Sequence, residues 1–74
     1  MDLTYLHSLN KEGILTKKGW ITVEDVISAN GRDICIFLES LKHKKTFAKH
    51  YKFSNFQNKT EVIDTAIKEF YRSL

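Results

Sequence analysis

Apolar and polar residues alternate on both sides of an Asn-Gly pair in the first half of the chain, a pattern typical of a β-hairpin. Asn30 and Gly31 tolerate the positive φ that a two-residue hairpin turn requires, so we place the turn there. Counting outward gives one face the pairs Ile27–Ile34, Asp25–Ile36 and Val23–Leu38, and the other face the pairs Val26–Cys35 and Glu24–Phe37. The second strand is apolar on both faces, which indicates a central strand covered on one side by the N-terminal segment or a second subunit.

A third strand follows if residues 42–45 form the next loop. In this register the pairs Ile34–Phe53, Ile36–Tyr51 and Ser40–Phe47 lie on the same face as Val23 and Ile27 of the first hairpin. Lys49, opposite Leu38, is the misfit, because it places a charged side chain on this apolar face. A helix over residues 22–41 is the alternative, because apolar residues from Ile34 to Leu41 also recur at helical spacing and Gly31 could end a helix. The β-branched and aromatic residues of 33–38 favour the sheet.

The last third of the chain predicts an amphipathic helix. Asn58 can cap its first turn and Glu61 lies three residues later, where it suits the positive end of the helix dipole. Its apolar stripe consists of Val62, Ile63, Ala66, Ile67, Phe70 and Tyr71. This stripe needs a sheet face, and the face that carries Ile34, Ile36 and Tyr51 is the expected partner, with Phe56 closing the connector.

The fold expected from these patterns is an α+β single domain of 74 residues. Residues 1–18 form an N-terminal segment, which can hold a short helix over 3–9 that ends near Gly13. Residues 19–53 form a three-stranded antiparallel sheet, and residues 58–73 form the helix that packs against it. A core of this size supplies only about 3–5 kcal/mol, so we expect a homodimer. No secretory signal or apolar span is evident and Cys35 is the single cysteine, which indicates a reducing cytoplasm.

Charge is segregated along the chain. Residues 40–60 contain six lysines and no acidic residue, whereas residues 1–39 have a net charge of −2 and the last fourteen residues a net charge of −1. The lysines alternate with histidines and aromatic residues, as expected of a surface that meets a polyanion. The alternative is a solvated basic hairpin without a ligand.

Several residues of the C-terminal half resemble a known family of DNA-binding domains. Three segments resemble the AP2-like domain, a group that includes the arm-binding domains of phage-type integrases. They are the end of the last strand with the segment that leads to the helix (Tyr51-Lys-Phe53 and Phe56), the start of the helix (Lys59-Thr-Glu61), and its middle (Ala66-Ile67-Lys-Glu-Phe70). The resemblance covers about residues 19–74 and implies that the outer face of a three-stranded sheet enters the major groove of DNA. Together with the charge pattern it nominates as binding residues Arg32, Lys42, Lys44, Lys45, Lys49, His50 and Lys52. The first strand departs from the pattern because Glu24 and Asp25 are acidic. Arg32 is the only arginine in the proposed reading surface, which implies little sequence specificity.

Catalytic and metal-binding chemistry is not expected. The three histidines and Cys35 have no metal-ligand spacing, and no phosphate-binding loop, catalytic triad or paired carboxylates can be assembled. We therefore expect neither enzyme activity nor a cofactor. Trp20, Cys35 and Phe37 are instead candidates for a protein or dimer interface.

Two functions remain open at this stage. The first is a small cytoplasmic protein that binds double-stranded DNA through its basic residues. The second is an inhibitor that binds an acidic or DNA-handling host protein, such as the sliding clamp of DNA replication, because the short Lys- and Asn-rich chain resembles the early host-takeover proteins of phages. The second hypothesis implies a location in the bacterial host cytoplasm.

Overall fold

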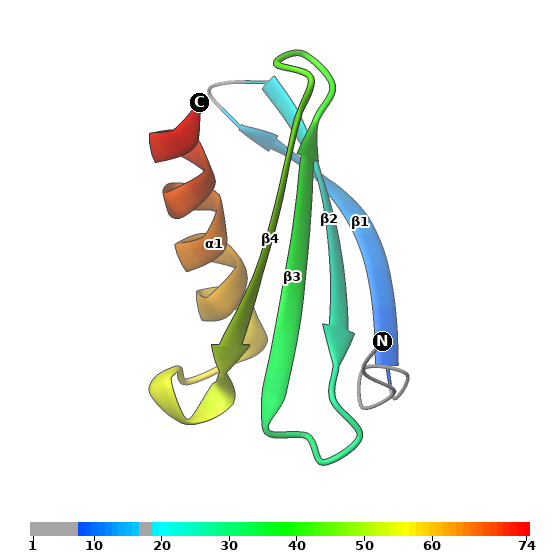
Figure 1. The fold of residues 1–74 in the computed structure, drawn as a ribbon, viewed down its shortest axis with the longest axis vertical. Helices are drawn as coiled ribbons and strands as arrows, with labels where there is room; N and C mark the ends of the chain where they lie inside the picture. Colours follow the sequence, from blue (N-terminus) through cyan, green and yellow to red (C-terminus); the bar gives the residue numbers. More distant parts are fainter. Residues whose placement is uncertain (1–7, 17–18) are drawn as a thin grey trace.

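The computed structural model describes residues 8–16 and 19–74 and has an α+β architecture of two layers (Figure 1). The strands are β1 (Ser8–Thr16), β2 (Gly19–Ile27), β3 (Asp33–Ser40) and β4 (Lys45–Lys52). They form one antiparallel sheet in the order β1-β2-β3-β4. A short 3₁₀ turn, η2 (Phe53–Asn55), leads to α1 (Lys59–Ser73), which lies along one face beside β3 and β4.

Strand β1 corrects the expectation of a three-stranded sheet. It pairs with β2 without interruption, from Ser8 opposite Ile27 to Thr16 opposite Gly19. The expected N-terminal helix lies largely outside the described residues, and its last positions, Ser8 and Leu9, belong to the strand. Leucine, lysine and glutamate are good helix formers, but pairing with a neighbouring strand outweighs such weak local preferences.

The register of the first hairpin is confirmed, but its turn is wider than expected. Ile27 lies opposite Ile34 and Val23 opposite Leu38, which excludes the helical alternative for residues 22–41. The chain reverses through a turn in which the Gly31 amide donates to the Ser28 carbonyl. Gly31 has a φ of 71°, whereas Asn30 acts through its side chain, whose Oδ1 accepts a hydrogen bond from the Arg32 amide.

The register expected for the second hairpin is wrong by two residues. Ile34 lies opposite Tyr51, Ile36 opposite Lys49, and Leu38 opposite Phe47. The loop consists of residues 41–44 and closes with Lys44 at a φ of 52°. A shift of two residues leaves every side chain on its expected face, because strand side chains alternate with a period of two.

The core lies between α1 and the sheet face that the sequence pattern indicates. Its buried members are Ile21, Val23, Ile34, Ile36, Leu38, Tyr51, Val62, Ile63, Ala66 and Phe70. The capping prediction is confirmed, since the Glu61 amide donates to Asn58 Oδ1 at 2.9 Å. Phe56 packs against the core and meets the Tyr51 ring edge to face, as expected of a residue that closes the connector.

Candidate binding surfaces

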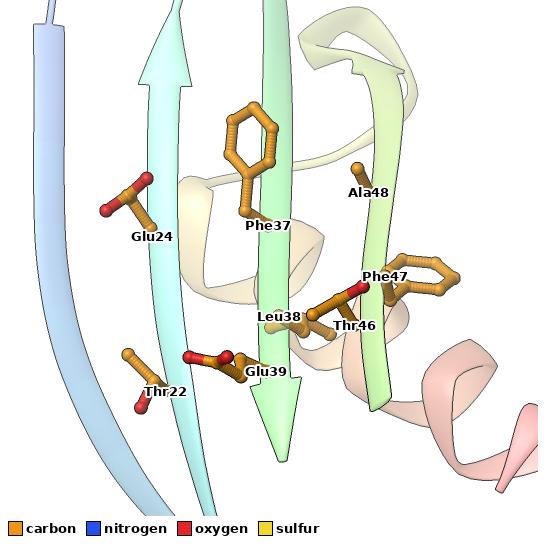
Figure 2. Close-up of a pocket in the computed structure, with 8 residues that line it drawn as sticks. All are labelled: Thr22, Glu24, Phe37, Leu38, Glu39, Thr46, Phe47 and Ala48. Atoms are coloured by element: carbon orange, nitrogen blue, oxygen red, sulfur yellow. The ribbon is translucent and has the colours of Figure 1, made fainter. Parts of the chain in front are cut away.

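Among the described residues α1 lies on one face of the sheet, and we call the opposite face the open face; Figure 2 views this face with α1 behind the strands. Phe37 projects from its centre, in a cross-strand row with Glu24 and Ala48. The next row consists of Thr22, Glu39 and Thr46. The two rows border a shallow hollow of about 360 Å³.

The open face carries large apolar side chains in contact with solvent. Leu15 and Trp20 are cross-strand partners with exposed fractions of 74% and 55%, and Phe37 is 38% exposed. Leu41, which is 71% exposed, follows at the end of β3. These residues place apolar surface at the centre and at one end of the same face.

The indole ring of Trp20 lies in the space that a glycine leaves on the neighbouring strand. Gly13 lies opposite Thr22, two residues along β2 from Trp20, and a Cβ atom at Gly13 would collide with the indole ring. The missing side chain therefore lets the ring lie against the backbone of β1. An aromatic ring that covers a strand glycine in this way loses little conformational freedom when a partner binds.

The basic residues nominated from the sequence do not share one surface. Lys42 and Lys44 lie in the β3–β4 loop, and Arg32 lies at the opposite end of the sheet, in the β2–β3 turn. Lys45 and Lys49 belong to the α1 side, whereas His50 and Lys52 belong to the open-face side of β4. Arg32 and Lys52 do come together, because both line a hollow of about 550 Å³ beside the turn.

Two of these lysines are engaged within the protein. Lys45 Nζ donates to the Ser73 carbonyl at 2.9 Å, where it satisfies the end of the helix. Lys49 Nζ contacts Glu69 at 3.0 Å. The misfit that Lys49 presents on the core face is thus resolved by an ion pair with a helix residue at the edge of the sheet.

Glu69 also accepts a hydrogen bond from Tyr51 Oη at 2.7 Å. The hydrogen bonds from Tyr51 and Lys49 lower the pKa of the Glu69 carboxyl below its usual value. Burial raises the pKa of the Tyr51 phenol, and the hydrogen bond and charge of Glu69 raise it further. Lys49, Tyr51 and Glu69 therefore form a latch between β4 and α1 rather than a free binding site.

From the sequence Asp25 was noted only as an acidic residue of the first strand, whereas in the structure its side chain is only 3% exposed. Its Oδ2 lies 3.4 Å from Lys59 Nζ at the first turn of α1 and has no hydrogen bond. A buried carboxylate needs a nearby cation, so this pair favours the docking of the helix start over β2. The signal in the sequence was an acid at a core-facing position of a strand.

Cys35 contributes little surface to any interface. Its side chain is on the open-face side of β3 but only 4% exposed, and burial raises the pKa of its thiol. Trp20 and Phe37 therefore remain as the accessible members of the interface expected from the sequence.

The described residues contain no cluster of three or more histidine, cysteine or acidic residues able to hold a metal ion. None of their helices is long and apolar enough to cross a membrane.

The described residues form a small α+β domain in which an open antiparallel sheet is backed by one helix. The chain matches no protein-family model, no curated protein and no solved structure.

Proposed function

We propose that this chain is a non-enzymatic module that binds a protein partner through the open face of its sheet. The observation that carries the proposal is the row of side chains at the centre of that face, where exposed Phe37 lies beside Glu24. Apolar and acidic groups suit a protein surface better than a DNA groove, because DNA phosphates would repel carboxylates of this face such as Glu24 and Glu39.

Trp20 is the expected energetic centre of the contact. Aromatic side chains dominate binding energies at protein interfaces, particularly where they are held in place before binding. Trp20 meets both conditions, since Gly13 provides the space for its ring while about half of the side chain stays exposed. Leu15 and Leu41 extend the apolar surface around it.

The partner class that fits this face is a DNA-handling protein, such as the sliding clamp of DNA replication in a bacterial host. Proteins that hold DNA present basic surfaces to the phosphates, and Glu24 and Glu39 would complement such a surface. Occupation of that surface would exclude DNA and inhibit the partner.

The first test is a binding measurement between the full chain and a purified bacterial sliding clamp by biolayer interferometry. Phe37→Asp and Trp20→Ala should each weaken binding at least tenfold, because interface anchors of this kind contribute about 2 kcal/mol or more. Lys68→Glu is the matched control, since Lys68 is exposed on α1, away from the open face.

Circular dichroism of each variant separates loss of binding from loss of the fold. Binding that survives both Phe37→Asp and Trp20→Ala in folded protein would exclude the open face as the interface. Absence of clamp binding would reject this partner, and the same variants would then be compared in affinity purification from host extract.

A further inference from the structure

A second surface runs along β4, which is an edge strand with no neighbour on its outer side among the described strands. The residues that face the open side are Thr46, Ala48, His50 and Lys52, and Lys44 precedes them in the loop. All five are exposed and none is acidic. We call these five residues the β4 rim, and we infer that it binds the phosphodiester backbone of a nucleic acid.

The geometry of the β4 rim suits a linear, regularly charged polymer. Alternate residues of a strand are about 6.6 Å apart, so the rim from Lys44 to Lys52 spans roughly 26 Å. Its middle carries small polar or apolar side chains that leave the backbone accessible. A charged chain can therefore follow the strand and meet a cation at each end.

The cations at the ends of the rim are available to a ligand. The ion pairs of the described residues join Lys49 to Glu69 and Lys59 to Asp25, so neither Lys44 nor Lys52 is neutralised in this way. Arg32 adds a third cation, because it lines the same hollow as Lys52 and Ser54. Its guanidinium group can form a bidentate contact with a phosphate, which lysine cannot.

Neighbouring acids limit where the ligand can lie. On β3, Glu39 lies opposite Thr46 and Asp33 lies opposite Lys52. On the helix side, Glu69 is occupied by Lys49 and Tyr51. A polyanion must therefore follow the outer side of β4, away from β3, where the sheet ends.

Protection of the sheet edge is the alternative explanation for these lysines, since charged side chains prevent an edge strand from pairing with other chains. Glutamate can also protect a sheet edge. The absence of any acidic residue from 40 to 60 is therefore not explained by edge protection, whereas a phosphate-binding strand requires it.

The test is fluorescence anisotropy of a labelled oligonucleotide, in single-stranded and duplex form, titrated with the full chain over a series of salt concentrations. Three phosphate contacts predict a slope of log affinity against log salt of about −2.7 for the duplex and about −2.1 for the single strand. Comparison of the two forms shows which nucleic acid supplies the backbone.

Two variants assign the binding to the β4 rim. Lys52→Glu should weaken binding, and Lys44→Asn should lower the magnitude of the salt slope by about one, as expected for loss of a phosphate contact. Asparagine tolerates the positive φ at position 44, so the loop keeps its conformation. Lys68→Glu, which changes net charge by the same amount as Lys52→Glu, should bind nearly as well as the wild type.

Absence of oligonucleotide binding at low salt would overturn the inference. Equal losses for Lys52→Glu and Lys68→Glu would also overturn it, because they would show an effect of net charge alone. Equal affinity for polyglutamate would reject the assignment to phosphodiester groups. None of these outcomes depends on the clamp measurement, so this site and the proposed function can fail separately.

Discussion

At the scale of single residues, Glu69 connects two elements that lie far apart in the sequence. It accepts hydrogen bonds from Tyr51 and Lys49 on β4, and its own position is on the fourth turn of α1. Hydrogen bonds to a charged group are stronger than those between neutral groups, and Tyr51 is a buried residue. The latch should therefore stabilise the docking of the helix on the edge strand.

Glu69→Gln should lower the free energy of unfolding at neutral pH by about 1 kcal/mol, because the amide replaces a charged acceptor. The pKa of Glu69 is lowered in the folded protein, so the contribution is complete above its ordinary value of 4.5 and is lost as pH falls through the lowered value. Urea unfolding at a series of pH values should show the two proteins converging in acid. Asp64→Asn, on an exposed position of α1, is the control, and an equal pH profile for both variants would contradict the role of the latch.

The sequence could not predict this latch or the pair of Asp25 and Lys59. Alternation shows that Lys49 and Asp25 face the core, where a charge is costly, so each was recognisable as an anomaly. The compensating partner belongs in both cases to α1, and its position depends on how the helix crosses the sheet. That crossing is set by packing, which a pattern of apolar residues does not specify.

At the scale of elements, the start of α1 depends on one side chain. Asn58 lies in an extended conformation and accepts a hydrogen bond from the Glu61 amide. Asn58→Ala should lower the free energy of unfolding by about 1 kcal/mol, as typical for loss of an N-cap. Thermal unfolding followed by circular dichroism measures the change, with Gln57→Ala as the neighbouring control. A loss of the same size in both variants would show that the cap itself is not responsible.

The elements differ in how far the sequence predicts them. The helix and the first hairpin were accessible because the cap, the apolar stripe and the Asn-Gly turn are local signals. The second hairpin was assigned to the correct face but in the wrong register, since a shift by two residues preserves alternation. Strand β1 was missed because its sequence contains no aromatic residue and few β-branched residues, and its conformation depends on pairing with β2.

At the scale of the whole molecule, the fold divides a continuous basic segment among different surfaces. The sequence reveals that residues 40–60 lack acids, but strand alternation sends half of β4 toward α1 and half toward the open side. The turns place Arg32 and Lys42 at opposite ends of the sheet. The extent of the positive charge was thus predictable, whereas its distribution required the topology.

The open face and the β4 rim should act independently. Trp20→Ala should weaken protein binding at least tenfold and leave oligonucleotide affinity within about twofold of the wild type, since Trp20 lies on β2, which is separated from β4 by β3, and additivity holds for separate sites. Lys52→Glu should have the converse effect. Both measurements on both variants complete the comparison, and a coupled loss in folded protein would show that the two ligands share one surface.

The position of the tryptophan has a spectroscopic consequence. Trp20 is the single tryptophan of the chain, yet about half of it meets water and it takes no part in the core. Its emission spectrum should therefore resemble that of a partly hydrated indole even in native protein, and change little with the packing of α1. The same emission would shift to shorter wavelength when a ligand covers the open face, so the wild-type chain carries its own optical reporter of occupancy.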